Sequence, residues 1–167
     1  GLCRGTAADL PRLNIHLRCG ERVLLQLGSF PARSFEALFQ GTAALPWEDF
    51  IPADGQFPVK GHALDSQLNS VPDCQKIIKK AAAKRLGERY GLEKLPETGA
   101  KHQIQFAIMR DQCFLYLDTS GPGLHKRGYR AVGVAAPLRE TLAAAMVQLS
   151  RYRGKDPFRD PFCGSGT

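Results

Sequence analysis

The sequence predicts an α+β fold, in which helices are layered on a small sheet and a second α/β unit begins near the end of the chain. Two observations lead to this prediction. The first is the order of apolar patterns, which runs helix, strand, helix over 6–39 and strand, helix, hairpin over 57–117. The second is a glycine-rich stretch at 160–167, which follows a short strand-like run. A strand that breaks into such a turn is typical of a doubly wound sheet.

Length and composition favour one domain or little more. The chain has 167 residues, of which 43% are hydrophobic, and no apolar run approaches the length of a membrane span. The five cysteines are odd in number, widely spaced and never form Cys-x-x-Cys, so we expect neither disulfides nor a zinc site, and a reducing cytoplasm. The chain shows no initiator Met or signal peptide and ends abruptly, which predicts an internal fragment of a longer protein.

The positive charge is confined to the second part of the chain. Residues 1–56 hold 5 basic and 6 acidic side chains, whereas residues 57–167 hold 18 basic and 10 acidic ones. A basic surface confined to one segment favours a polyanionic partner. The alternative is a basic face that is only solvated.

The first elements form a small α+β unit that lacks an opening strand. A helix is expected over 6–18, where Thr6 can cap the first turn. Alternation then predicts a strand over 22–30, and a serine cap predicts a short helix over 34–39. Trp47 follows in a turn, where we interpret it as a packing anchor rather than a base-stacking platform. The proline- and glycine-containing loop at 51–56 is the expected subdomain boundary.

The next elements are a strand over 57–64, a long helix over 70–90 and a hairpin over 103–117. Ser70 and the following proline are a helix-start signal, and Gly91 is a helix-stop signal. The hairpin strands alternate apolar and polar side chains on either side of a turn at 110–112.

The long helix carries six cations outside its apolar stripe, with Glu88 as the only acid assigned to it beyond the first turn. We interpret this face as a phosphate-binding surface, and the alternative is an exposed helix built from good helix formers. The cations are Lys76, Lys79, Lys80, Lys84, Arg85 and Arg89.

A second basic motif follows the irregular stretch 118–123. Backbone-tracking charges around an aromatic ring suit RNA, and the alternative is a linker that packs through its Arg and Tyr. No second metal ligand stands at ligand spacing from the histidine. The motif residues are His125, Lys126, Arg127, Tyr129 and Arg130.

A helix expected over 138–149 then leads through a basic loop to the octet Asp-Pro-Phe-Cys-Gly-Ser-Gly-Thr at 160–167. Gly164 and Gly166 allow the backbone to approach a ligand closely, and a helix starting at Thr167 would present free N–H groups to an anion. Cys163 has no basic neighbour and is interpreted as a small residue in the turn. The octet resembles the first cofactor motif of amino-group methyltransferases that use S-adenosylmethionine (AdoMet).

Over nearly its whole length the chain resembles the THUMP-containing RNA guanine-N2 methyltransferases, and most closely the bacterial large-subunit ribosomal RNA subfamily, often labelled N6-adenine-specific DNA methylases. The most specific motifs are Leu-His-Lys-Arg-Gly-Tyr-Arg at 124–130 and the octet at 160–167. The resemblance implies a ferredoxin-like remnant (1–55), a THUMP core (56–120), a basic linker with a first helix (121–156), and the truncated start of a Rossmann-like methyltransferase domain (157–167).

The resemblance also implies a function. The intact enzyme would transfer a methyl group from AdoMet to the exocyclic N2 of a guanosine in 23S rRNA, and the fragment alone would be inactive. It would bind RNA, and we expect no metal and no membrane. RNA would contact Lys76, Lys79, Lys80, Lys84 and the motif at 125–130. The residues implied to hold AdoMet are Asp160, Phe162, Gly164, Ser165, Gly166 and Thr167.

Two alternatives stay open from the sequence. One is a DNA adenine-N6 methyltransferase, because the octet occurs there too. The other is a stand-alone RNA-binding protein without catalysis. No residue of this chain is a candidate catalytic base, and the Asn/Asp-Pro-Pro-aromatic motif that holds the target amino group in the family is absent from it.

Overall fold

The computed structural model describes residues 1–128 and 138–163, which form parts of two compact units. The sheet unit is Leu24–Asp118, and the helical unit combines Gly1–Val23 with Thr119–Thr167. The expected boundary at 51–56 lies inside the sheet unit. None of the helices in the described part of the chain is both long and apolar enough to cross a bilayer.

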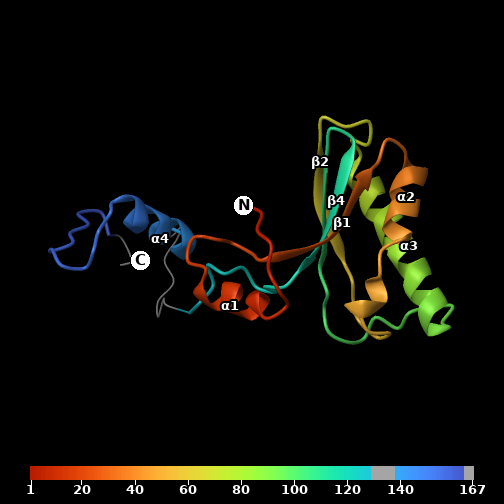
Figure 1. Ribbon diagram of the computed structural model, residues 1–167, viewed down its shortest axis with the longest axis horizontal. Coiled ribbons are helices and arrows are strands. Elements are labelled where there is room, and N and C mark those ends of the chain that lie inside the picture. Colours follow the sequence, from red (N-terminus) through yellow and green to blue (C-terminus); the bar gives the residue numbers. More distant parts are fainter. Residues whose placement is uncertain (129–137, 164–167) are drawn as a thin grey trace. The chain divides into compact units, whose positions relative to one another are not determined.

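The sheet unit contains a four-stranded mixed sheet (Figure 1). Its strands are β1 (Leu24–Pro31), β2 (Val59–Leu64), β3 (Ile104–Met109) and β4 (Gln112–Asp118), in the order β1-β4-β3-β2. The β3–β4 hairpin lies at the centre, β1 pairs antiparallel with β4, and β2 pairs parallel with β3. The mixed α/β architecture therefore agrees with the α+β class predicted from the sequence.

Two helices cover one face of this sheet. α2 (Phe35–Ala43) and α3 (Val71–Tyr90) pack against each other, and the 3-10 turn η1 (Trp47–Asp49) packs on α3 (Figure 1). A single hydrophobic core fills the space between helices and sheet, and each large apolar side chain buried there contributes about 1.5–3 kcal/mol. Its largest members include Trp47, Phe57, Leu38, Ile78, Leu86, Phe106 and Leu115.

The helix signals read from the sequence are confirmed at most ends. The Ser34 side chain accepts a hydrogen bond from the Ala37 N–H at 3.1 Å and so caps α2. α3 ends at Gly91, whose φ of 66° is left-handed, and the Leu92 N–H bonds the Gly87 carbonyl. Ser70 precedes α3 as predicted, but its hydroxyl donates to the Asp73 carboxylate at 2.6 Å instead of capping the backbone.

The hairpin turn takes its shape from Arg110 and Asp111, which both have positive φ angles of 49° and 61°. Two such residues give the turn a twist that matches the flanking strands. The Asp111 carboxylate accepts hydrogen bonds from the Gln67 N–H and the Ser66 hydroxyl, both at 2.9 Å, which lower its pKa. The turn is therefore tied to the loop between β2 and α3.

The helical unit contains α1 (Asp9–His16) and α4 (Glu140–Leu149). α1 is shorter than the helix expected over 6–18, although Thr6 does bond the Asp9 carboxylate at 2.8 Å at its start. The strand-like run before Asp160 was wrongly predicted, because residues 157–160 have no strand conformation. A strand needs a neighbour for its backbone hydrogen bonds, and no described residue pairs with this run.

Candidate nucleic-acid interface

The basic surface of the sheet unit is the polar side of α3. The apolar stripe of this helix is fully buried in the core at Cys74, Ile78, Ala81, Ala82 and Leu86. Because the stripe fixes the rotation of the helix, the lysines between these positions lie on its outer sides. Lys76, Lys80 and Lys84 are exposed, and their spacing of four residues aligns them along the helix, about 6 Å apart.

These three lysines, the lysine row, make only weak contacts within the protein. Lys76 lies 3.6 Å from Asp73 and Lys84 lies 3.8 Å from Glu88, in exposed pairs of a kind that contributes less than about 1 kcal/mol. The Lys84 ammonium group also lies over the Phe39 ring, at 5.8 Å from its centre. Lys80 forms no ion pair with any residue that the structure describes. Breaking these ion pairs to bind phosphates would therefore cost little free energy.

Lys79 is held more firmly than the lysine row. Its ammonium group lies 2.8 Å from the Glu97 carboxylate and 4.9 Å from the centre of the Phe57 ring. A cation over an aromatic ring and beside a carboxylate is already well solvated by the protein. We therefore expect a smaller part in ligand binding for Lys79 than for its neighbours.

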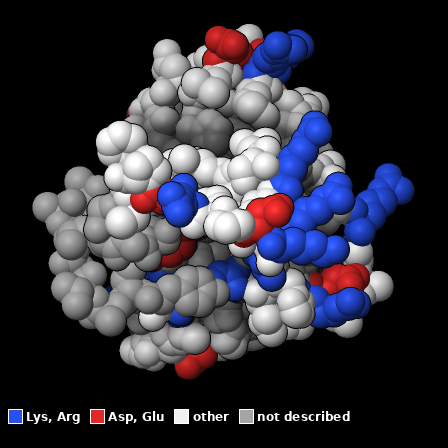
Figure 2. Space-filling view, turned by 90° about the vertical axis from the view of Figure 1, so that its left-hand side faces the viewer, with Lys and Arg blue, Asp and Glu red and all other residues white. Residues whose placement is uncertain are grey.

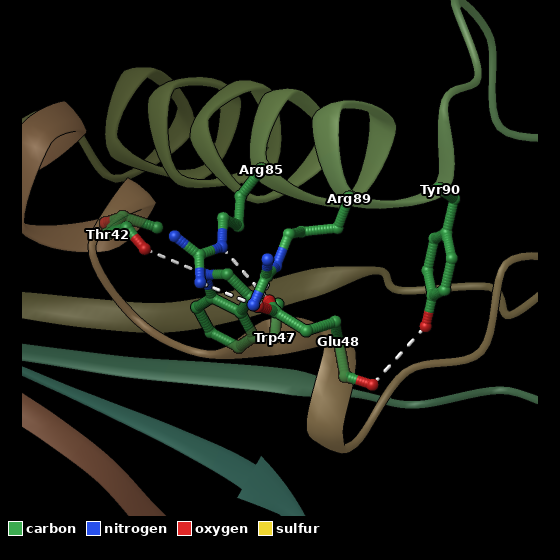
Figure 3. A network of polar contacts seen from close by, with 6 residues as sticks. All are labelled: Thr42, Trp47, Glu48, Arg85, Arg89 and Tyr90. Carbon is green, nitrogen blue, oxygen red and sulfur yellow. Dashed lines mark hydrogen bonds and ion pairs between the residues drawn. The ribbon is translucent and has the colours of Figure 1, made fainter.

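The two arginines of α3 are not part of the free basic surface. Figure 3 shows Arg85 and Arg89 reaching from α3 to Glu48 on the 3-10 turn, each with a contact of 2.6 Å to its carboxylate. The hydrogen bond from Arg85 contributes most to lowering the pKa of Glu48, to about 2. The interpretation of six cations facing Glu88 alone was wrong, because Glu48, from a distant part of the sequence, pairs with two of them and offsets one positive charge.

Trp47 is confirmed as a packing anchor. Its side chain is fully buried, and its indole N–H donates to the Thr42 carbonyl at 2.8 Å (Figure 3). Buried in this way, the ring has no face open to a base. Tyr90, at the end of α3, has its hydroxyl 2.7 Å from the Ile51 carbonyl and 3.3 Å from the Glu48 carbonyl, which links it to the turn that carries Trp47 (Figure 3).

Arg127 of the basic motif in the helical unit is engaged in internal contacts. The Arg127 guanidinium donates to the carbonyls of Asn14, Ile15 and Leu17, at the carboxyl end of α1. A cation there satisfies orphan carbonyls and opposes the negative end of the helix dipole. Sequence reasoning missed this contact, because the two segments lie more than 100 positions apart.

The other members of this motif differ in their surroundings. His125 Nδ1 lies 2.8 Å from the Glu21 carboxylate, and the Thr141 hydroxyl donates to that carboxylate at 2.6 Å, which lowers the pKa of Glu21. Lys126 is exposed. The predicted RNA contacts Tyr129 and Arg130 lie outside the described residues.

The cofactor octet is described only up to Cys163. The Asp160 carboxylate accepts a hydrogen bond from the Phe162 N–H at 2.9 Å, which closes a turn at the start of the octet. Asp160 is exposed, and Phe162 is 91% exposed. The remaining positions predicted to hold AdoMet, from Gly164 to Thr167, lie outside the described residues.

Comparison with protein families defines the class of this protein. Residues 32–118 match the THUMP domain, and residues 127–167 match the RMKL-like methyltransferase domain. The chain therefore belongs to the THUMP-containing methyltransferase family. The first match falls on the sheet unit and the second on the stretch that ends in the octet.

Particular relatives agree with this assignment. The chain is 47% identical over 165 residues to YpsC of Bacillus subtilis, named as a candidate RNA methyltransferase, covering 98% of this chain and 43% of the relative. It is 34% identical to the ribosomal RNA large subunit methyltransferase K/L of Syntrophotalea carbinolica, covering 98% of this chain and 24% of that protein. The chain thus spans less than half the length of these relatives.

Solved structures show the same architecture. A Listeria monocytogenes protein described as a predicted N6-adenine-specific DNA methylase has a TM-score of 0.91 at 48% identity, over 97% of this chain and 43% of that one. SMU.472, described as a candidate methyltransferase in complex with SAH, has a TM-score of 0.80 at 43% identity, over 87% of this chain and 39% of that one. TrmN from Thermus thermophilus, at 19% identity and a TM-score of 0.64, shares the fold over 90% of this chain and 43% of its own.

Proposed function

We propose that this chain is the RNA-recognition part of an AdoMet-dependent methyltransferase that modifies the exocyclic N2 of a guanosine in 23S rRNA. The observation that carries the proposal is a THUMP-matched sheet unit with a row of weakly paired lysines, in one chain with a methyltransferase cofactor motif. In this proposal residues 1–120 recognise RNA, 121–156 connect the domains, and 157–167 begin the Rossmann-like domain. The enzyme would act in the cytoplasm.

The charge distribution supports RNA as the partner. Lys76, Lys80 and Lys84 present three adjacent cations on one side of α3, and Lys126 is exposed in the second motif. Figure 2, which faces the left-hand side of Figure 1, shows more Lys and Arg than Asp and Glu side chains at the surface in view. Cations arranged in this way bind a phosphate backbone by releasing its counterions.

The described start of the octet, at Asp160, supports AdoMet as the cofactor. One oxygen of the Asp160 carboxylate accepts a hydrogen bond from the Phe162 N–H. The side chain is exposed, so the carboxylate can also accept a hydrogen bond from the amino group of a ligand. Carboxylate acceptors beside a glycine-rich turn suit the methionine end of AdoMet. When bound, AdoMet supplies the methyl group. An amino group on a base becomes accessible only when that base leaves its stack.

Two other functions are less well supported. The name of the Listeria monocytogenes structure refers to DNA adenine, but the chain's relatives also include ribosomal RNA methyltransferases, and its THUMP match covers the sheet unit. A stand-alone RNA-binding protein would have no use for residues 127–167, which match a methyltransferase domain.

Replacing Asp160 by Ala in the full-length protein should separate cofactor binding from RNA binding. We expect AdoMet affinity to fall by about 10- to 100-fold, since a hydrogen bond between charged groups is lost, while affinity for rRNA stays near wild type. Calorimetry with AdoMet and a gel shift with rRNA measure the two effects. Asp156→Ala, which removes an exposed carboxylate from the same loop, is the matched control. Wild-type AdoMet affinity in Asp160→Ala would place the cofactor elsewhere.

A further inference from the structure

The sheet of the sheet unit has a second face that the helices α2 and α3 do not cover. Ile104, Phe106 and Ile108 of β3 point into the core, so the alternate positions of this strand belong to the opposite face. Residues paired with these alternate positions on the neighbouring strands lie on the same opposite face. This open face includes Gln26 and Ser29 of β1, Phe114 and Tyr116 of β4, Gln105 and Ala107 of β3, and Lys60 and His62 of β2.

The open face is accessible at its edges. On its two outer strands Gln26, Ser29, Lys60 and His62 are exposed, and so are the apolar residues Leu24 and Leu64 at the strand ends. Within the sheet unit, the described helices contact the sheet only from the core side, as Figure 1 shows for α2 and α3. The polar edge residues therefore remain available as hydrogen-bond donors and acceptors.

Two aromatic rings occupy the middle of this face. Phe114 and Tyr116 stand two positions apart on the inner strand β4, roughly 6.6 Å along the strand, and both are half-buried. Phe114 lies opposite Ala107 on β3, whose small side chain is buried between its neighbours on this face. Tyr116 lies between Gln26 of β1 and Gln105 of β3, which are its register partners on the two neighbouring strands.

We propose that the open face binds single-stranded RNA, with bases stacked on Phe114 and Tyr116. This inference rests on the proposed function and adds a second contact surface to the lysine row. Adjacent rings on an inner strand are how sheet-based RNA-binding modules stack successive bases. Gln26, Gln105 and His62 would contact base edges, and Lys60 would contact a phosphate.

The chemistry of the face favours RNA over a protein segment as its occupant. The exposed apolar side chains of this face, Leu24, Leu64 and Met109, lie at the ends of the strands. Across the middle of the face a protein segment would bury Lys60, His62 and the two glutamines, and each would need a partner there. RNA offers phosphates and base edges to the same groups. At the edge of the face, Asp118 would repel a phosphate. Its carboxylate accepts a hydrogen bond from the Gln105 amide at 3.1 Å.

Stacking is tested with Phe114→Leu and Tyr116→Leu in the full-length protein. The probe is a uridine-rich single-stranded RNA of ten nucleotides that carries 5-iodouridine. Each variant should weaken binding by about 5- to 150-fold, because leucine keeps the apolar contact with the sheet but has no ring to stack on. The slope of log affinity against log salt should not change, since no charge is altered. Photo-crosslinks in the wild-type protein should map to 112–118.

Phe35→Leu is the matched control, because Phe35 is an exposed phenylalanine of the same unit on α2. Unchanged affinity in both sheet variants, or crosslinks confined to other segments, would overturn the inference. A lower melting temperature with wild-type affinity would also overturn it, by showing that a protein segment covers the face. If the lysine-row variant still weakens rRNA binding in these cases, only the further inference is rejected and the proposed function stands. If the lysine-row variant binds rRNA like wild type, both the inference and the proposed function are rejected.

Discussion

Replacing Lys76, Lys80 and Lys84 by Glu is expected to weaken binding of structured rRNA by about 100-fold at low salt. Each lysine that contacts a phosphate contributes about 0.9 to the slope of log affinity against log salt, so the slope should flatten by about 3. The fold should survive, because all three side chains are exposed. Filter binding between about 50 and 200 mM salt measures both quantities.

The control for this triple variant separates a local contact from a change in net charge. Lys94→Glu reverses an exposed charge of the sheet unit outside α3, and it is compared with Lys80→Glu alone. We expect the Lys80 variant to lose affinity and the Lys94 variant to bind nearly as well as wild type. An unchanged slope in the triple variant would mean that this side of α3 is only solvated.

Replacing Glu48 by Gln should destabilise the sheet unit by about 2 kcal/mol at pH 7, since hydrogen bonds to a charged group are lost and Arg85 and Arg89 lose their carboxylate. The Glu48 side chain is only 13% exposed. Urea unfolding followed by the fluorescence of Trp47, the only tryptophan, measures the change. Glu97→Gln removes the partner of Lys79 at a more exposed site and should cost less than about 1 kcal/mol.

The effect of Glu48 should depend on pH in a defined direction. Its pKa is lowered from 4.5 to about 2 in the folded protein, so the carboxylate stabilises the fold fully above pH 4.5. This stabilisation is lost as the pH falls toward 2. Wild type and Glu48→Gln should therefore differ most at neutral pH and converge in acid. A constant difference from pH 7 to pH 2 would show that the ion pairs do not cause it.

Local signals in the sequence predicted most of the secondary structure. The caps at Ser34 and Gly91, the apolar stripe of α3 and the alternation in the β3–β4 hairpin each depend on residues within a few positions of one another. The strand before Asp160 was wrongly predicted for the opposite reason. Its pattern is local, but its backbone hydrogen bonds depend on a neighbouring strand.

The sequence predicted the site less completely than the fold. Lysines on α3 could be assigned to a surface from helical periodicity alone. The partners of Arg85 and Arg127 could not be predicted in this way. Glu48 lies 37 positions from Arg85, and Ile15 lies 112 positions from Arg127. The open sheet face was missed as well. Alternation places Phe114 and Tyr116 on one side of β4, but only the packing of α2 and α3 shows which side is covered.

Mapping of methylated nucleotides in 23S rRNA tests the central claim most directly. The rRNA is taken from a strain that lacks the full-length gene and from the same strain complemented with wild type or with the lysine-row triple variant. We expect one N2-methylguanosine to be lost in the deletion strain, restored by wild type, and restored poorly by the triple variant. An rRNA methylation map that is unchanged by the deletion, with N6-methyladenine lost from DNA instead, would contradict this account.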